Sequence, residues 1–276
     1  MSSQQPIGIF DSGLGGLSVL REVWQQLPLE STVYIADQAN LPYGTRPAGE
    51  IQALSEAIMR QLLRQKAKLV FVACNTASAA ALDHLRSTFP DTAIVGMEPA
   101  VKPATAHTRS GVIGVLATGS TLQADRYASL VTRFARDTSI IPIAAPELVE
   151  IVEAGLAASE QCKILVRRIL AKPLAQGMDT LVLGCTHFQF LKKTIRDVGG
   201  PELVIIDPNA AVAGQAGRVL AKRNLSAGKA ANRYIKFQTT GNPALMHMRL
   251  LEMLGKEWDV SSVPGLTTNP THPGRG

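Results

Sequence analysis

Short apolar runs recur along the chain, and each is followed by a small polar turn and then by a helix-like pattern. The stretches 69–76 (LVFVACNT) and 180–187 (TLVLGCTH) show this form most clearly. Runs without a polar face predict strands covered on both sides, as in a parallel sheet flanked by helices. The other predicted strands are residues 6–10, 31–36, 92–96, 111–117, 139–143, 203–206 and 231–239. The sequence therefore predicts an α/β protein with mostly parallel sheets.

The alternation of strands and helices begins a second time at residue 111, which predicts two similar α/β domains with an active-site cleft between them. Apolar residues recur at helical spacing between the strands, for example over residues 48–66. The end of the chain is rich in Pro, Gly, Thr and Ser, a composition typical of a flexible tail. The predicted parts are a first domain of residues 1–98 plus 210–255, a second domain of residues 99–209, and a tail of residues 256–276.

Composition narrows the class of protein. The 276 residues are 46% hydrophobic and 18% charged, which indicates a globular chain. The net charge of +6 suits an acidic substrate, but only 5% of the residues are aromatic, so we expect no nucleic-acid partner. No apolar run reaches the roughly 18 residues that span a bilayer, so we expect no membrane partner. Three cysteines and a start without signal-peptide features predict a reducing, cytoplasmic location.

Two of the three cysteines stand where a parallel sheet places its ligands. Cys74 and Cys185 directly follow predicted strands, and open α/β sheets bind ligands beyond the carboxyl ends of their strands. Buried structural cysteines are common. Cys162 lies inside a helical pattern and is interpreted as a residue on a helix face without a role in the chemistry. The other two have Asn, Thr or His as neighbours, so we expect both thiols to face one cleft.

Three chemistries use such thiols. A zinc site of Cys74, Cys185 and His187 lacks a CxxC pair and a fourth ligand close in sequence. A single nucleophile, Cys185 with His187 as base, leaves Cys74 without a role. Acid–base chemistry at carbon uses both thiols, one on each face of the substrate, because a free thiol with a pKa near ~8.5 can both donate and accept a proton. The alternative to an enzyme is a protein that binds a ligand or a nucleic acid without catalysis.

A glycine-rich turn follows the first predicted strand. Residues 10–18 (FDSGLGGLS) contain three glycines, which permit close approach of the backbone to a ligand. Ser18 stands where a dinucleotide-binding turn has its third glycine, so that fingerprint is absent. Asp11 and Ser12 lie at the strand end and are candidates for orienting a thiol or holding a substrate, although an Asx turn explains Asp11 equally well.

Four motifs in this order resemble the bacterial glutamate racemases: FDSGLGGLS (10–18), LPYG (41–44), ACNT (73–76) and GCTH (184–187). The resemblance covers about residues 6–255. It implies a cofactor-independent isomerase that interconverts L- and D-glutamate, uses no metal, supplies D-glutamate for peptidoglycan synthesis and forms a homodimer. Related racemases for aspartate or hydantoins and maleate isomerases share the cysteine pair, so another small acid is the alternative substrate.

The resemblance also implies a set of site residues. Cys74 and Cys185 are the implied catalytic residues, and Asp11, Asp37, Glu153 and His187 assist them. Preorganised donors are needed to stabilise carbanion-like charge and to hold the substrate carboxylates. The implied substrate-binding residues are Asp11, Ser12, Pro42, Tyr43, Gly44, Asn75, Thr76, Thr118, Thr121, Thr186 and His187.

Overall fold

The computed structural model describes residues 2–228 and 232–266. Within these residues the strands form two sheets, and all of their pairings are parallel. The first sheet, ordered β10-β9-β2-β1-β3-β4, comprises β1 (Ile7–Asp11), β2 (Thr32–Ala36), β3 (Leu69–Val72), β4 (Ala93–Gly96), β9 (Ile235–Thr239) and β10 (Val260–Ser262). The second, ordered β6-β5-β7-β8, comprises β5 (Val112–Ala117), β6 (Ser139–Ala144), β7 (Thr180–Leu183) and β8 (Val204–Ile206). The predicted fold class is confirmed.

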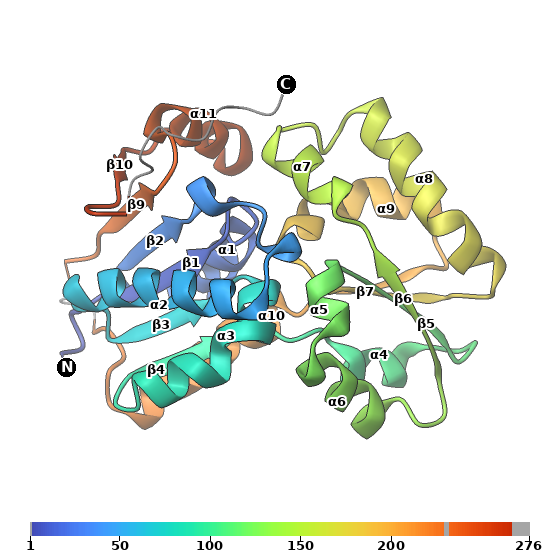
Figure 1. Cartoon of the computed structure of the whole chain (residues 1–276), viewed down its shortest axis with the longest axis horizontal. Coiled ribbons are helices and arrows are strands. Elements are labelled where there is room, and N and C mark those ends of the chain that lie inside the picture. The colour runs from blue at the N-terminus through green and yellow to red at the C-terminus, as the bar shows by residue number, and fades with distance from the viewer. Residues whose placement is uncertain (1, 229–231, 267–276) are drawn as a thin grey trace.

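Helices cover both faces of the first sheet (Figure 1). The relevant helices are α1 (Leu17–Gln26), α2 (Ala48–Arg64), α3 (Asn75–Thr88), α10 (Asn209–Lys222) and α11 (Pro243–Leu254). Ile7 and Ile9 of β1 belong to the core that α1 and α10 close, whereas Phe10 belongs to the core under α2 and α3. This alternation shows why the strand must be apolar on both sides, as its sequence predicted.

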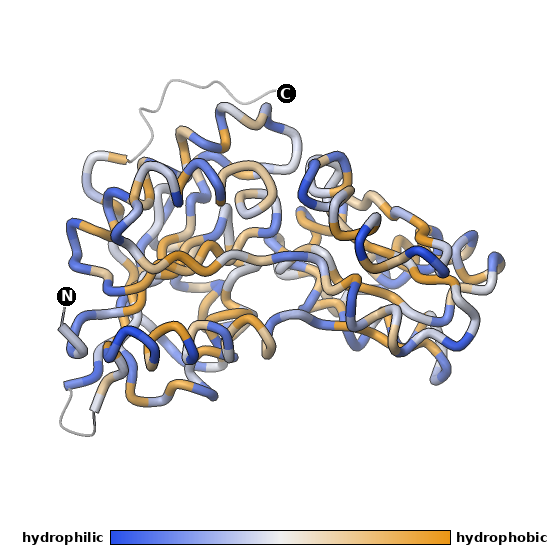
Figure 2. The backbone as a smooth tube through the Cα atoms, turned by 90° about the horizontal axis from the view of Figure 1, so that it is seen from below, coloured by the Kyte–Doolittle hydropathy of each residue, from blue (hydrophilic) through white to orange (hydrophobic). Residues whose placement is uncertain are grey.

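The second sheet is built in the same way. Its helices are α4 (Val101–His107), α5 (Gly119–Gln123), α6 (Asp125–Phe134), α7 (Glu147–Glu153), α8 (Glu160–Ala175) and α9 (Lys192–Gly199). One core lies between the sheet and α7, α8 and α9, and another lies on the side of α4 and α6. Figure 2 shows the apolar segments running through the middle of both parts of the molecule. Among the described helices, none is both long enough and apolar enough to cross a membrane.

The chain passes from the first sheet to the second after β4 and returns to the first through α10 and β9 (Figure 1). The domain boundaries proposed from the sequence stay a prediction. The prediction of a flexible tail from residue 256 is wrong in part. β10 lies in this segment and pairs with β9, with Val260 opposite Phe237. The apolar residues of this segment explain the pairing: Trp258 packs on Trp24 with 5.5 Å between ring centroids, and Val263 is fully buried. Residues 267–276 of the predicted tail lie outside the described residues.

Candidate active site

Both predicted thiols stand at the carboxyl ends of central strands. Cys74 follows β3 and caps α3, with its Sγ accepting a hydrogen bond from the Ala77 amide at 3.4 Å. Cys185 follows β7 and precedes a short 3-10 helix, η3 (Thr186–Leu191). The two cysteines line one cavity, and each is at most 6% exposed. The two sheets therefore bring together two cysteines that are 111 residues apart in sequence (185 minus 74). Cys162, by contrast, lies in α8 and is buried in the core of the second sheet.

Most of the predicted substrate-binding residues line this cavity. The predicted lining residues are Ser12, Pro42, Tyr43, Gly44, Thr76, Thr118, Thr186 and His187, together with the two cysteines. Sequence reasoning missed Thr45, Pro146 and Val149, which complete the wall. Thr45 directly follows the LPYG motif and could have been included. Pro146 and Val149 carry no chemical signal, because only the docking of α7 makes them part of the site.

Five predicted residues do not line the cavity: Asp11, Asp37, Asn75, Thr121 and Glu153. The substrate contacts predicted for Asp11, Asn75 and Thr121, and the assisting roles predicted for Asp37 and Glu153, stay predictions. All of them except Asn75 make side-chain hydrogen bonds with residues that line the cavity. The Thr121 hydroxyl, for example, lies 2.9 Å from the Thr118 hydroxyl, which in turn lies 2.9 Å from that of Thr76. Asn75 differs, because its side-chain amide has no hydrogen-bond partner among the described residues.

A buried histidine connects Cys185 to a carboxylate. His187 Nδ1 lies 3.7 Å from Cys185 Sγ, and His187 Nε2 lies 2.7 Å from Glu153 Oε1. Burial acts to lower the pKa of His187, but its hydrogen bonds and charge interactions with Cys185 and Glu153 hold that pKa well above its usual range. Burial likewise acts to raise the pKa of Glu153, and the hydrogen bond from His187 outweighs it, so that pKa is lowered. An imidazolium–carboxylate pair results, and its Nδ1–H donates toward the Cys185 sulfur.

Cys74 has the opposite environment. Burial, and next the nearby charge of Asp11, raise the pKa of the Cys74 thiol to about 12. The thiol lies 3.7 Å from Ser12 Oγ, to which it donates. Asp11 accepts hydrogen bonds from the Gly13 amide at 3.0 Å and from Thr186 Oγ1 at 3.2 Å. The site is therefore asymmetric, with a protonated thiol on one side and a sulfur facing a cationic donor on the other.

Asp37 supports the tyrosine turn rather than either thiol. Its carboxylate accepts hydrogen bonds from Tyr43 Oη at 2.5 Å and from Thr240 Oγ1 at 2.7 Å. Burial and the charge of Asp37 hold the pKa of Tyr43 well above its usual range, so the phenol stays protonated and donates. The turn also reaches the second sheet, because Ser120 Oγ donates to the Gly44 carbonyl.

The glycine-rich turn receives side chains from the second sheet. A Cβ added at Gly13 would lie 2.1 Å from Glu153 Oε1, and one added at Gly15 would lie 2.4 Å from His187 Nδ1. The Leu14 amide donates to Glu153 Oε1 at 2.6 Å. At Gly13 and Gly15 the absent Cβ makes room for the histidine and its carboxylate partner. The close approach of a ligand to this turn stays a prediction.

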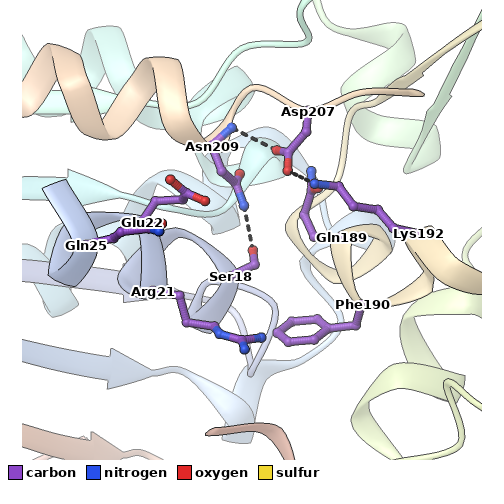
Figure 3. A pocket seen from close by; sticks show the side chains of 9 residues that line it. All are labelled: Ser18, Arg21, Glu22, Gln25, Gln189, Phe190, Lys192, Asp207 and Asn209. Atoms are coloured by element: carbon purple, nitrogen blue, oxygen red, sulfur yellow. Dashed lines mark hydrogen bonds and ion pairs between the residues drawn. The ribbon is translucent and has the colours of Figure 1, made fainter. Parts of the chain in front are cut away.

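A second pocket lies between α1 and the segment that follows Cys185 (Figure 3). None of the predicted catalytic residues lines it. Its wall includes Ser18, whose Oγ accepts from Asn209 Nδ2 at 3.0 Å and lies 3.2 Å from the Thr186 carbonyl. The cysteine cavity remains the candidate active site. In the described part of the chain, no three His, Cys, Asp or Glu side chains are grouped so as to hold a metal ion, so the zinc hypothesis gains no support.

Comparisons with known proteins agree with this geometry. The sequence profile described as Asp/Glu/hydantoin racemase matches residues 7–216. The chain is similar to a glutamate racemase of Herpetosiphon aurantiacus, with 48% identity over 240 residues that cover 87% of this chain and 94% of the relative.

Solved structures give the same result. A glutamate racemase of Bacillus anthracis superimposes with a TM-score of 0.86 at 30% identity, covering 96% of this chain and 99% of the other. The glutamate racemase of Escherichia coli, solved with L-glutamate and the activator UDP-MurNAc-Ala, gives a TM-score of 0.81 at 32% identity and covers 94% and 97% of the two chains. With the family profile covering most of its length and a relative at 48% identity, the chain belongs to the Asp/Glu/hydantoin racemase family.

Proposed function

We propose that the chain interconverts L- and D-glutamate by moving the Cα proton between two thiols, Cys74 and Cys185. The observation that carries this proposal is the shared cavity, to which each sheet contributes one cysteine. Inversion at carbon needs a base on one face and an acid on the other. The asymmetric surroundings of the two sulfurs support this pair of roles.

The proposed step balances in protons. In it Cys185 reacts as the thiolate, with His187 Nδ1 3.7 Å from its Sγ, and Cys74 reacts as the thiol. The thiolate takes the Cα proton from the enantiomer that presents it, and Cys74 gives its proton to the opposite face. Cys185 ends as the thiol and Cys74 as the thiolate. The other enantiomer reacts by the reverse of these steps, starting from that second distribution of protons.

Charge that develops at Cα must be stabilised inside the cavity. Thr76, Thr118 and Thr186 line it, and their hydroxyls are the proposed donors to the substrate carboxylates. The amide of Asn75, buried and without a partner among the described residues, is a further donor next to the thiol of Cys74 in sequence. Glu153, Asp11 and Asp37 act on the reaction through the groups that they hold in place.

Glutamate is proposed as the substrate because the relatives are glutamate racemases and the Escherichia coli protein was solved with L-glutamate. All three cysteines lie in the described part of the chain and none is in a disulfide, which supports a reducing, cytoplasmic location. From the activity we infer a role in supplying D-glutamate for peptidoglycan. A homodimer stays a prediction.

The test is deuterium exchange at Cα combined with loss of optical rotation. Incubation of L-glutamate in D2O without added cofactor should give deuterated D-glutamate, and aspartate run in parallel should exchange far more slowly. Cys74→Ser and Cys185→Ser should each abolish racemisation, whereas Cys162→Ala, remote from the cavity, should retain it. Full racemisation by either serine variant rejects the two-thiol mechanism, and faster turnover of aspartate rejects the substrate assignment.

A further inference from the structure

A hydrogen-bonded bridge joins the histidine–carboxylate pair to the far strands of the first sheet. Gln38 follows β2 at the start of a short 3-10 helix, η1 (Gln38–Asn40). The register of β2 and β9 places Ala36 opposite Thr239, so the Gln38 side chain reaches a residue 201 positions away in sequence. Neither residue belongs to a motif, and the proposed function leaves both without a role.

The hydrogen bonds around Thr239 fix the orientation of the Gln38 amide. Thr239 Oγ1 accepts from the Gly241 amide at 2.9 Å, which leaves its hydroxyl hydrogen to donate to Gln38 Oε1, also at 2.9 Å. An oxygen that accepts there forces the amide nitrogen to the other side. Gln38 Nε2 accordingly faces Glu153 Oε2 at 3.4 Å.

This contact completes the shell of the Glu153 carboxylate. Oε1 already accepts from the Leu14 amide and from His187 Nε2, so Gln38 is the donor to the second oxygen. The bond also crosses from the first sheet to α7 beside the second sheet. Glu153 is only 12% exposed at its side chain, so water screens these interactions weakly.

The other titratable groups around the pair are few. Cys185 faces His187 directly, and Asp11 reaches the same segment through Thr186. The phenol of Tyr34 and the thiol of Cys74 are close enough to feel the same charges, but both stay protonated because burial, with the charge of Asp11, raises the pKa of each. Gln38 differs from these residues because its side chain is neutral and acts on Glu153 only through its amide dipole.

We propose that Gln38, held by Thr239, is a positioning residue that sets the protonation of the Glu153–His187 pair and thereby the charge on Cys185. The proposal rests on the proposed racemase function. The positive end of an amide dipole beside a carboxylate favours its ionised form. Removing that dipole raises the proton affinity of both Glu153 and His187, so the pH range of activity moves upward.

The pH dependence of kcat/KM tests this inference. Gln38→Leu removes the donor and should lower kcat/KM about fivefold while moving the low-pH limb upward. Gln38→Glu places a second carboxylate beside Glu153 and should move that limb further, by about one pH unit. Thr239→Val releases the amide and should shift the limb in the same direction by less, whereas Thr239→Ser, which keeps the hydroxyl, should shift it less than Thr239→Val.

Gln52→Leu is the matched control. It removes a comparable amide hydrogen bond, from Gln52 Nε2 to the Ala80 carbonyl at 2.9 Å between α2 and α3, far from the pair. The inference is supported when only the Gln38 and Thr239 variants move the limb, and it is overturned when a folded Gln38→Glu variant keeps the wild-type profile or when Gln52→Leu shifts it equally. Absence of racemisation by the wild-type chain would instead reject the proposed function.

Discussion

Substituting Gly13 by alanine tests whether the second sheet positions Glu153 against the glycine-rich turn. The added Cβ would lie 2.1 Å from Glu153 Oε1 and 2.8 Å from Leu41 Cδ1. Because nonbonded atoms settle at about 3.5 Å, the carboxylate must retreat by more than about 1 Å. Its hydrogen bonds with His187 Nε2, at 2.7 Å, and with the Leu14 amide, at 2.6 Å, would then exceed hydrogen-bond length.

The loss can be given a magnitude. Hydrogen bonds to a charged group are worth about 1.5–3 kcal/mol each, and about 1.4 kcal/mol corresponds to a factor of ten in rate. Partial relaxation of Glu153 retains some of that energy, so we expect kcat/KM to fall about 100-fold. The assay is racemisation followed by circular dichroism, with thermal unfolding measured in parallel to show that the variant is folded.

Gly49→Ala supplies the control for the same chemical change. Gly49 lies in the first turn of α2, and a Cβ there meets nothing within 4 Å. We expect full activity and slightly higher stability, because alanine favours a helix more than glycine does. A double variant of Gly13→Ala with Glu153→Asp should be little worse than Glu153→Asp alone, because both act on one contact. Wild-type kcat/KM in Gly13→Ala would refute the reasoning.

Two further predictions concern charge. Cys185 and Glu153 together hold the pKa of His187 high against the effect of burial. Glu153→Gln removes the second of these partners, so the pKa of His187 should fall and the high-pH limb of kcat/KM should move to lower pH. An unmoved limb contradicts the ion pair. The raised pKa of His187 stabilises the folded state fully below about pH 6.5, and this stabilisation is lost as pH rises through the folded-state pKa. In urea titrations Glu153→Gln should therefore lose most stability at low pH. Lys68→Met leaves Glu30, 2.5 Å from Lys68 Nζ in a fully buried pair, without a counter-charge and should cost about 3–5 kcal/mol of unfolding free energy. A second change, Glu30→Gln, should recover part of that loss, and an unchanged urea midpoint in Lys68→Met argues against the pair.

The sequence by itself determined the strands and the positions of the thiols. Apolar runs such as β1 and β7 are readable because a strand covered on both faces cannot hold polar side chains. The cysteines are readable because they follow such runs at the point where a parallel sheet places its ligands. Four short motifs then indicated the family, since each combines a strand end with the polar residues of the site.

Only the tertiary structure decided how the two halves meet. Glu153 lies in α7 without a motif, and its contact with Gly13 arises from the docking of one sheet against the other. Gln38 reaches Thr239 because β9 returns to pair with β2 late in the chain. The strand β10 was not predicted because it is stabilised by pairing with β9 and by the packing of Trp258 on Trp24. Both contacts involve residues distant in sequence. Local patterns encode burial, whereas contacts between distant segments depend on a packing geometry that no short window of sequence contains.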